Sequence, residues 1–199
     1  TLRGLKLIGK EKWLDFSYLA GGTALALRLG HRRSVDLDFF TPKKFDEQIL
    51  LAQLKKTGQY KPEQTAWRTL KGRFFDVSFG LFYYEYPILQ KSDDFFGVEI
   101  AGLEDIAAMK INAIEDRGSK RDFVDLFFLS QKFSFSKMFE FYDQKYRCLE
   151  SHKYNILKSL NYFEDAESED LPQMFKPISW PEIKTFFQKE VKKLSANLI

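Results

Sequence analysis

Apolar and polar positions follow two different patterns along the chain, and the change from one to the other divides it in two. In the first hundred residues, segments with helical spacing are interleaved with short segments of period two, whereas the remainder has almost only helical spacing. This order predicts an α+β protein: a small mixed sheet flanked by helices in residues 1–99 and a helical lobe in residues 100–199.

The first segments alternate between helix and strand. Residues from position 4 onward have mixed helical spacing and predict a helix that ends before Tyr18. The segment YLAGG predicts a short strand that enters a glycine turn. TALALRLG then predicts a helix, with Thr23 as its candidate N-cap and Gly30 as its end.

The next segments contain the acidic residues of interest. VDLDFF alternates with period two, so Asp36 and Asp38 are expected on one face of a strand. FDEQILLAQLKKTG predicts an amphipathic helix. TAWRTLKGRFFDVSFG predicts a hairpin that turns at Lys71 and Gly72, with Asp76 in the centre of its second strand.

The C-terminal half is predicted to be helical. Two helices, EIAGLEDIAAMKINAIEDRG and KRDFVDLFFLSQKF, are separated at Gly118. The acidic run EDAESED (164–170) is expected to be a solvated loop. Further helical segments are predicted at 136–146, 151–163, 170–175 and 181–196.

Composition predicts a soluble protein of the cytoplasm. The chain has 199 residues, of which 44% are hydrophobic and 30% charged, as in ordinary globular proteins. No apolar run is long enough to span a membrane, and the polar start TLRGLKLIGKEKW does not resemble a signal peptide. The first residue is not Met, so we expect a trimmed chain or one that begins inside a longer polypeptide. The single Cys148 excludes an internal disulfide, and the net charge of +3 is compatible with a polyanionic partner without requiring one.

Two like charges side by side, at Asp36 and Asp38, need an explanation. Either the strand is exposed, or a cation lies between the two carboxylates. The stretch from Gly22 to Asp36 is long enough for a turn, a short helix and a return into a strand. The N–H groups of Gly21–Thr23 would then begin a helix, where phosphate binds, and the aspartates could hold Mg²⁺ shared with that phosphate. Asp76 supplies a third strand carboxylate. The glycine turn, the paired aspartates and Asp76 together suggest two-metal nucleotidyl transfer.

Four motifs in order give the chain a family resemblance. GGT…DLDF, the strand FDVSF, MKINAI and RDFVDL resemble the nucleotidyltransferase toxins of the AbiEii/AbiGii type, within the DNA polymerase β-like nucleotidyltransferase superfamily. The resemblance covers nearly the whole chain. It implies a nucleotidyltransferase fold with a helical C-terminal lobe, use of NTP and two Mg²⁺ ions, and action as the toxin of a toxin–antitoxin pair of the phage abortive-infection type. It also implies a tRNA acceptor and a cognate antitoxin as partner.

The resemblance assigns roles to residues that local sequence does not. It implies catalytic and metal-binding roles for Asp36, Asp38 and Asp76, and a catalytic role for Asp122 at the acceptor hydroxyl or the nucleotide sugar. The helical lobe, which carries Lys110 and Asp122, would form the wall of the active-site cleft that faces Asp36 and Asp38. Nucleotide-binding roles are implied for Gly21, Gly22, Thr23, Lys110, Arg121 and Asp125.

Other interpretations remain open for several of these residues. Lys110 in isolation is typical of a surface lysine, and Asp122 and Asp125 could stabilise the first turn of a helix. Arg121 could pair with Asp125 as ordinary helix support. Arg28 and Arg33 could contact phosphate or only water, and neither His31 nor His152 has metal-ligand spacing.

The acceptor and the activity itself also have alternatives. The same fold could transfer a nucleotide to a small molecule, as in the antibiotic adenylyltransferases, or to a protein side chain. A third hypothesis is a catalytically idle module that binds nucleotide or antitoxin. The paired aspartates argue against that module, because binding alone does not require paired metal ligands.

Overall fold

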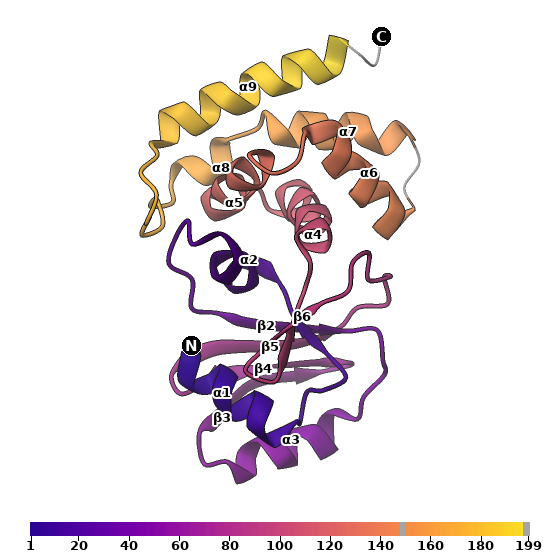
Figure 1. Ribbon diagram of the computed structural model, residues 1–199, viewed down its shortest axis with the longest axis vertical. Coiled ribbons are helices and arrows are strands. Elements are labelled where there is room, and N and C mark those ends of the chain that lie inside the picture. Colours follow the sequence, from indigo (N-terminus) through magenta and orange to yellow (C-terminus); the bar gives the residue numbers. More distant parts are fainter. Residues whose placement is uncertain (148–149, 197–199) are drawn as a thin grey trace. The chain divides into compact units, whose positions relative to one another are not determined.

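The chain folds into two compact units that do not follow a single cut in the sequence. A computed structural model describes residues 1–147 and 150–196 (Figure 1). The first unit comprises Thr1–Ala24 and Ser34–Gly102, and the second comprises Leu25–Arg33 and Leu103–Ile199. The segment 25–33 thus belongs with the C-terminal helices, which a division between residues 99 and 100 does not anticipate. Cys148 lies outside the described residues.

A mixed sheet forms the centre of the first unit. Its strand order is β3-β4-β5-β2-β1-β7-β6. β2 pairs with β5 and β1 with β7 in parallel, and the other neighbours are antiparallel. This mixed sheet with helices around it confirms the predicted α+β class. The strands are β1 (Tyr18–Leu19), β2 (Leu37–Thr41), β3 (Tyr60–Ala66), β4 (Thr69–Phe74), β5 (Val77–Tyr83), β6 (Asp93–Phe95) and β7 (Val98–Ile100).

Helices α1 (Leu2–Glu11) and α3 (Glu47–Lys56) cover one face of this sheet (Figure 1). Apolar side chains of the strands point to that face and are buried, since alternate residues of a strand point to opposite sides. Gly4 of α1 lies directly against Leu37 and Phe74. The core of the unit includes Leu37, Phe39, Leu70, Phe74, Phe79 and Leu81.

The hairpin predicted at Lys71 and Gly72 is wrong. Both residues lie inside β4, where Gly72 faces Lys61 and Tyr60 too closely for any side chain. The turns lie instead before β4 and between β4 and β5, where Phe75 and Asp76 have positive φ. The sequence thus encodes three antiparallel strands here rather than two.

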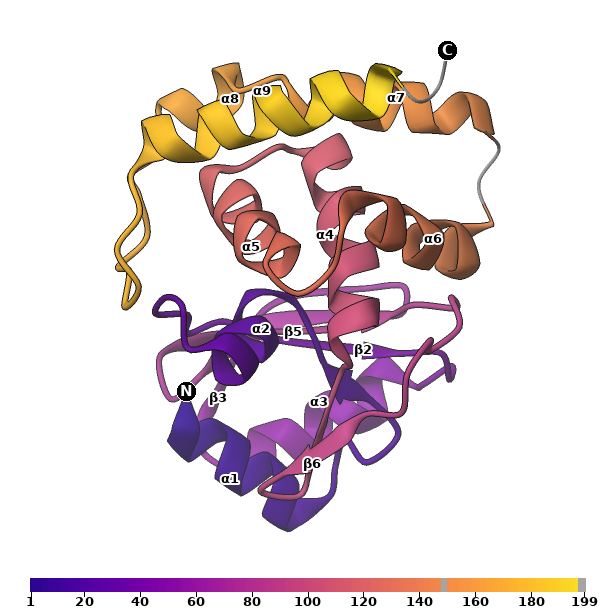
Figure 2. The same ribbon diagram turned by 45° about the horizontal axis from the view of Figure 1, so that its top comes forward.

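The second unit is built from helices and one extended segment (Figure 2). α4 and α5 are separated at Gly118, which has a φ of +52°, as predicted. Phe123 of α5 packs against Phe163, Trp180 and Phe187 in an aromatic core. The helices are α4 (Leu103–Asp116), α5 (Lys120–Ser130), α6 (Phe135–Tyr146), α7 (Glu150–Leu160), α8 (Glu164–Glu167) and α9 (Trp180–Ala196).

Three local predictions in the C-terminal half are wrong. The acidic run at 164–170 begins with the short helix α8, and 170–175 is extended instead of helical. There Met174 forms a β-bridge with Arg32, and Gln173 accepts a hydrogen bond from the N–H of Arg33. The segment before α4 is strand β7 up to Ile100, because it pairs with β1 and β6. No helix among the described residues is both long and apolar enough to cross a membrane.

Candidate active site

The pair Asp36 and Asp38 lies at the start of β2. Leu37 and Phe39 are fully buried in the core, so the alternate positions 36 and 38 are directed to the other face of the sheet. Asp36 directly precedes the strand, and both aspartates are half-buried. The shared face that alternation predicts therefore exists, with carboxylates at two consecutive positions along it.

Backbone without side chains approaches Asp38 from two directions. Gly21 has a φ of +69°, and a Cβ there would lie 3.4 Å from Oδ2 of Asp38. On the neighbouring strand β5, Gly80 pairs with Asp38, and a Cβ there would lie 3.4 Å from Oδ1. The N–H of Ala20 also donates to the carbonyl oxygen of Asp38 at 3.0 Å. Glycine at both positions therefore lets the backbone approach the carboxylate closely.

The helix that begins at this point is α2 (Gly21–Leu29). It starts two residues earlier than predicted, so Thr23 is not its N-cap but lies inside the first turn. There its hydroxyl donates to the hydroxyl of Ser34 at 3.0 Å. The first N–H groups of a helix have no partner within the helix, and the helix dipole favours an anion there. Gly21, Gly22 and Thr23 therefore supply an anion-binding terminus beside Asp38.

Asp76 does not lie where the sequence predicts. It occupies the turn between β4 and β5 with a φ of +60°, and its side chain is 81% exposed and 3.6 Å from Lys61. Gly80, four residues further along, is the residue that pairs with Asp38. At about 3.3 Å per strand residue, Asp76 is on the order of 13 Å along the strand from that position. The prediction of a central strand carboxylate is wrong, because Asp76 lies in the exposed turn and away from the position opposite Asp38.

The donor chemistry of the site fits a hard divalent cation. Asp36 and Asp38 offer carboxylate oxygens, which are the ligands of Mg²⁺, and Mg²⁺ typically takes one or two carboxylates plus substrate phosphates. Within residues 1–147 and 150–196, no cluster of three or more His, Cys, Asp or Glu side chains is placed to hold a metal ion. The pair with the α2 terminus therefore fits Mg²⁺ that shares its coordination with a triphosphate.

A second pair of aspartates lies in the helical unit, on α5. Lys110 of α4 is buried between them, with its Nζ 2.8 Å from Oδ1 of Asp122 and 2.6 Å from Oδ2 of Asp125. Both carboxylates are fully buried. Lys110 is therefore not the surface lysine that its helix position alone suggests.

Further side chains surround this pair of carboxylates. Arg32 donates to Asp125 from Nε at 2.6 Å and from a terminal nitrogen at 2.8 Å, and Nε2 of His31 lies 2.8 Å from the same carboxylate. Asp122 accepts from Arg117 at 2.8 Å and from the Ser119 hydroxyl at 2.6 Å. Lys110, these four residues and the two aspartates of α5 are called the buried ion network below.

The network changes the acidity of its members. Burial alone would raise the pKa of Asp122, but the Lys110 ammonium and the Arg117 guanidinium outweigh it and hold that pKa well below its ordinary value. Burial likewise opposes ionisation of Asp125, but Lys110, Arg32 and His31 outweigh burial and hold the pKa of Asp125 well below its ordinary value. Burial disfavours the charged Lys110, yet the two carboxylates raise its pKa. All three side chains are thus held in their charged forms at neutral pH.

Sequence reasoning missed the roles of His31 and Arg32. Both are buried, although they follow a glycine in the polar segment GHRRS, which is typical of a surface loop. No local pattern pairs them with Asp125, more than ninety residues away. Arg121 is exposed on the first turn of α5, whereas Asp125 is fully buried.

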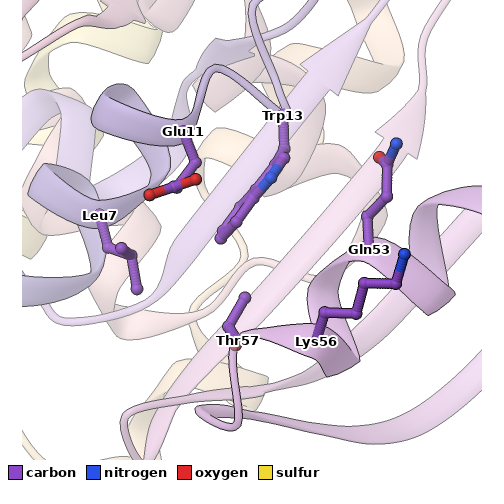
Figure 3. A pocket seen from close by; sticks show the side chains of 6 residues that line it. All are labelled: Leu7, Glu11, Trp13, Gln53, Lys56 and Thr57. Atoms are coloured by element: carbon purple, nitrogen blue, oxygen red, sulfur yellow. The ribbon is translucent and has the colours of Figure 1, made fainter.

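A separate pocket of about 440 Å³ lies among α1 and α3 (Figure 3). These helices pack on the core face of the sheet, opposite to the face of Asp38. As far as the structure describes its lining, neither Asp36 nor Asp38 takes part. The pocket is lined by Leu7, Glu11, Trp13, Gln53, Lys56 and Thr57.

Comparisons with known proteins match the chain first at the level of sequence. Residues 7–197 match the family described as nucleotidyl transferase AbiEii toxin, type IV TA system. An uncharacterised protein of Aquifex aeolicus (strain VF5) is 41% identical over 190 residues, covering 92% of this chain and 89% of its own length.

Solved structures with low identity share the fold. MenT4, a nucleotidyltransferase toxin of Mycobacterium tuberculosis H37Rv, has a TM-score of 0.61 at 15% identity, covering 91% of this chain and 76% of its own. JHP933 of Helicobacter pylori has a TM-score of 0.51 at 20% identity, covering 98% and 91%. The antibiotic-resistance factor ANT(2'')-Ia has a TM-score of 0.53 at 14% identity, covering 75% and 94%.

Proposed function

Because the chain belongs to the AbiEii family of nucleotidyltransferase toxins, we propose that it transfers a nucleoside monophosphate from an NTP to a hydroxyl of an RNA acceptor. The family resemblance indicates tRNA as the class of acceptor and a cognate antitoxin as the partner that restrains the toxin. The observation that carries the proposal is the carboxylate pair Asp36 and Asp38 beside the glycine start of α2.

The proposed reaction is a single displacement at the α-phosphorus. The acceptor oxygen forms a bond to that phosphorus, and the bond from the phosphorus to the oxygen bridging toward the β-phosphate breaks. Pyrophosphate leaves, and the hydroxyl proton passes to solvent. In-line attack needs positioning and charge stabilisation more than a protein nucleophile.

The residues of the first unit have distinct roles in this proposal. The N–H groups of Gly21, Gly22 and Thr23 bind triphosphate oxygens at the positive end of α2. Asp36 and Asp38 would hold Mg²⁺, which would supply positive charge to the phosphates and lower the pKa of the acceptor hydroxyl. Asp76 is left out of the metal set because it lies in the exposed turn.

The roles expected for the helical unit stay predictions that rest on the family resemblance. Lys110 directs its ammonium to Asp122 and Asp125, and an ammonium has three donors, so one remains for a phosphate. Asp122 and Asp125 would then fix Lys110 in place and keep it charged. Asp122 is additionally predicted to position the acceptor hydroxyl or the nucleotide sugar, and Arg121 to contact nucleotide.

The test is a labelling experiment with the full chain. The protein is incubated with Mg²⁺, total RNA and each of the four NTPs, labelled at the α-phosphate, and RNA and protein are then separated. We expect label in tRNA from one or more NTPs, and no label when EDTA replaces Mg²⁺. Label on protein or on a small molecule would contradict the RNA acceptor, and no label anywhere would favour the idle module.

A binding measurement tests the metal assignment without turnover. Asp36 and Asp38 would hold Mg²⁺ together with the NTP, so NTP with Mg²⁺ should stabilise the fold more than the sum of the two separate effects. At about 100 Kd of ligand the gain is about 2.7 kcal/mol, which is about 5–10 °C in Tm for a chain of this size. Equal Tm shifts for NTP with Mg²⁺ and NTP with EDTA would contradict this site.

A further inference from the structure

The sheet face that carries Asp38 continues across two more strands. Residues opposite each other on neighbouring strands place their side chains on the same face. Asp38 of β2 is opposite Gly80 of β5, which is opposite Lys71 of β4. One step further along, Phe40 is opposite Phe82, and their rings lie 5.4 Å apart. The face beside the carboxylate pair is therefore formed by aromatic and basic side chains.

Phe82 lies beside the carboxylate of Asp38. A Cβ at Gly80 would be 2.5 Å from the Phe82 ring and 3.4 Å from Oδ1 of Asp38, so ring and carboxylate meet above the same glycine. The ring is only half-buried. Nζ of Lys71 lies 5.7 Å from its centroid, and Lys71 is exposed. A partly exposed ring with a lysine ammonium over it thus adjoins the proposed metal site.

The outer strands add positive charge to this face. Lys61 of β3 is opposite Arg73 of β4, and both are exposed. At the paired positions of β3, β4 and β5 on this face, the structure has three cations and no acidic side chain. Asp76, in the turn, offsets part of the charge of Lys61, and its carbonyl oxygen accepts from Arg73. Lys71 has no ion pair or hydrogen bond from its side chain among residues 1–147 and 150–196.

We propose that Phe82 and Lys71 form the seat of a single-stranded end of the RNA acceptor, with a base on the Phe82 ring and a phosphate on Lys71. This inference rests on the proposed function, because it names where the acceptor of that reaction binds. A base stacks on an aromatic ring whatever its identity, and a lysine beside the ring binds the backbone phosphate. A base inside a duplex is already stacked on its neighbours, so the seat requires an unpaired end. The seat brings the acceptor hydroxyl to the Asp38 carboxylate.

Substitutions at Phe82 and at Lys71 test the contribution of the aromatic ring and that of the positive charge separately. Phe82→Leu removes the aromatic ring, and Phe82→Tyr keeps it. Lys71→Ala removes the cation from an exposed position, and Lys55→Ala makes the same change on α3, on the core side of the sheet. If Phe82→Leu lowers the stability of the protein, Lys71→Ala still tests whether this part of the sheet binds RNA. Thermal melts of all variants identify any loss of folding.

Direct binding to RNA is measured first, without turnover. The probes are a 5′-labelled single-stranded oligonucleotide and total tRNA, each read by fluorescence anisotropy. We expect Phe82→Leu and Lys71→Ala to weaken binding about tenfold, with Phe82→Tyr and Lys55→Ala close to the wild type. The slope of log K against log salt should fall by about 0.7 for Lys71→Ala and stay unchanged for Phe82→Leu.

Turnover then distinguishes the acceptor from the nucleotide. The KM for RNA should rise in Phe82→Leu and Lys71→Ala, while the Tm shift with NTP and Mg²⁺ stays that of the wild type. Unchanged RNA binding and KM in both variants, with the wild type active, would overturn the seat and leave the proposed function intact. A loss of NTP binding instead would assign the ring to the nucleotide base and also overturn it. A wild type that binds RNA through these residues but transfers nothing to it would support the seat and overturn the proposed reaction.

Discussion

Two pairs of aspartates in this protein have opposite surroundings. Asp36 and Asp38 lie at the start of strand β2, with glycine backbone approaching Asp38 from both sides. Asp122 and Asp125 lie on a helix, fully buried, with Lys110 between them at hydrogen-bonding distance. A fully buried carboxylate needs protein cations and donors to balance it, whereas a half-buried carboxylate stays within reach of water and of a cation from solution. The spacing of two carboxylates along the sequence therefore does not by itself identify a metal site.

The largest expected effect is on catalysis at the first pair. Asp38→Asn keeps the size of the side chain but removes the negative charge that would hold Mg²⁺, so we expect turnover to fall by about 10²–10³-fold or more. Folding should remain intact, because removing one of two neighbouring like charges relieves repulsion. Turnover and thermal melts measure both effects.

A matched variant makes this prediction specific. Asp15→Asn makes the same change at an exposed position and should leave turnover unchanged. Asp36→Asn is expected to behave like Asp38→Asn. Full activity in either variant of the pair would show that the metal assignment is wrong.

Substitution in the second pair should instead lower the stability of the fold. Asp125→Asn leaves Lys110 and Arg32 buried with less compensating charge, and such a break costs about 3–5 kcal/mol in the free energy of unfolding. Urea unfolding of the variant and the wild type measures the difference. Because the residues act as a unit, Lys110→Met combined with Asp125→Asn should cost less than the sum of the single changes. Additive losses would contradict the network.

The same network predicts how stability responds to acid. The pKa values of Asp122 and Asp125 are lowered in the folded protein, so both bind protons more readily when unfolded. Their contribution is therefore present above the unfolded pKa of about 3.9 and is lost as the pH falls toward the lower folded values. The free energy of unfolding should drop more steeply below about pH 4 in the wild type than in Asp125→Asn. Parallel curves for the two proteins would exclude this origin of acid sensitivity.

The smallest effect concerns two glycines with the same backbone strain. Gly21 has a φ of +69° and Gly30 one of +57°, so alanine at either costs about 1–2 kcal/mol. The Cβ at position 21 would also contact Asp38, whereas one at position 30 would have no heavy atom of the described residues within 4 Å apart from its own residue and its chain neighbours. We expect Gly21→Ala to lose activity and Gly30→Ala to keep it, at similar Tm. Equal activities would show that space beside Asp38 is unimportant.

The sequence by itself determined the features that depend on neighbouring residues. The period of two placed Asp36 and Asp38 on one face, and Gly30 and Gly118 ended helices because they readily adopt positive φ. The family motifs identified the fold class, since that resemblance covers nearly the whole chain.

Only the tertiary structure decided which charges meet. The register of β2 and β5 puts Gly80 rather than Asp76 opposite Asp38. The turn between β4 and β5, which the sequence pattern did not predict, leaves Asp76 at the surface. Likewise, Asp125 forms an ion pair with Arg32 and contacts His31, and both lie in the segment that packs with the C-terminal helices. Such pairings depend on the path of the backbone over tens of residues, whereas the periodicity of a segment reports only its own faces.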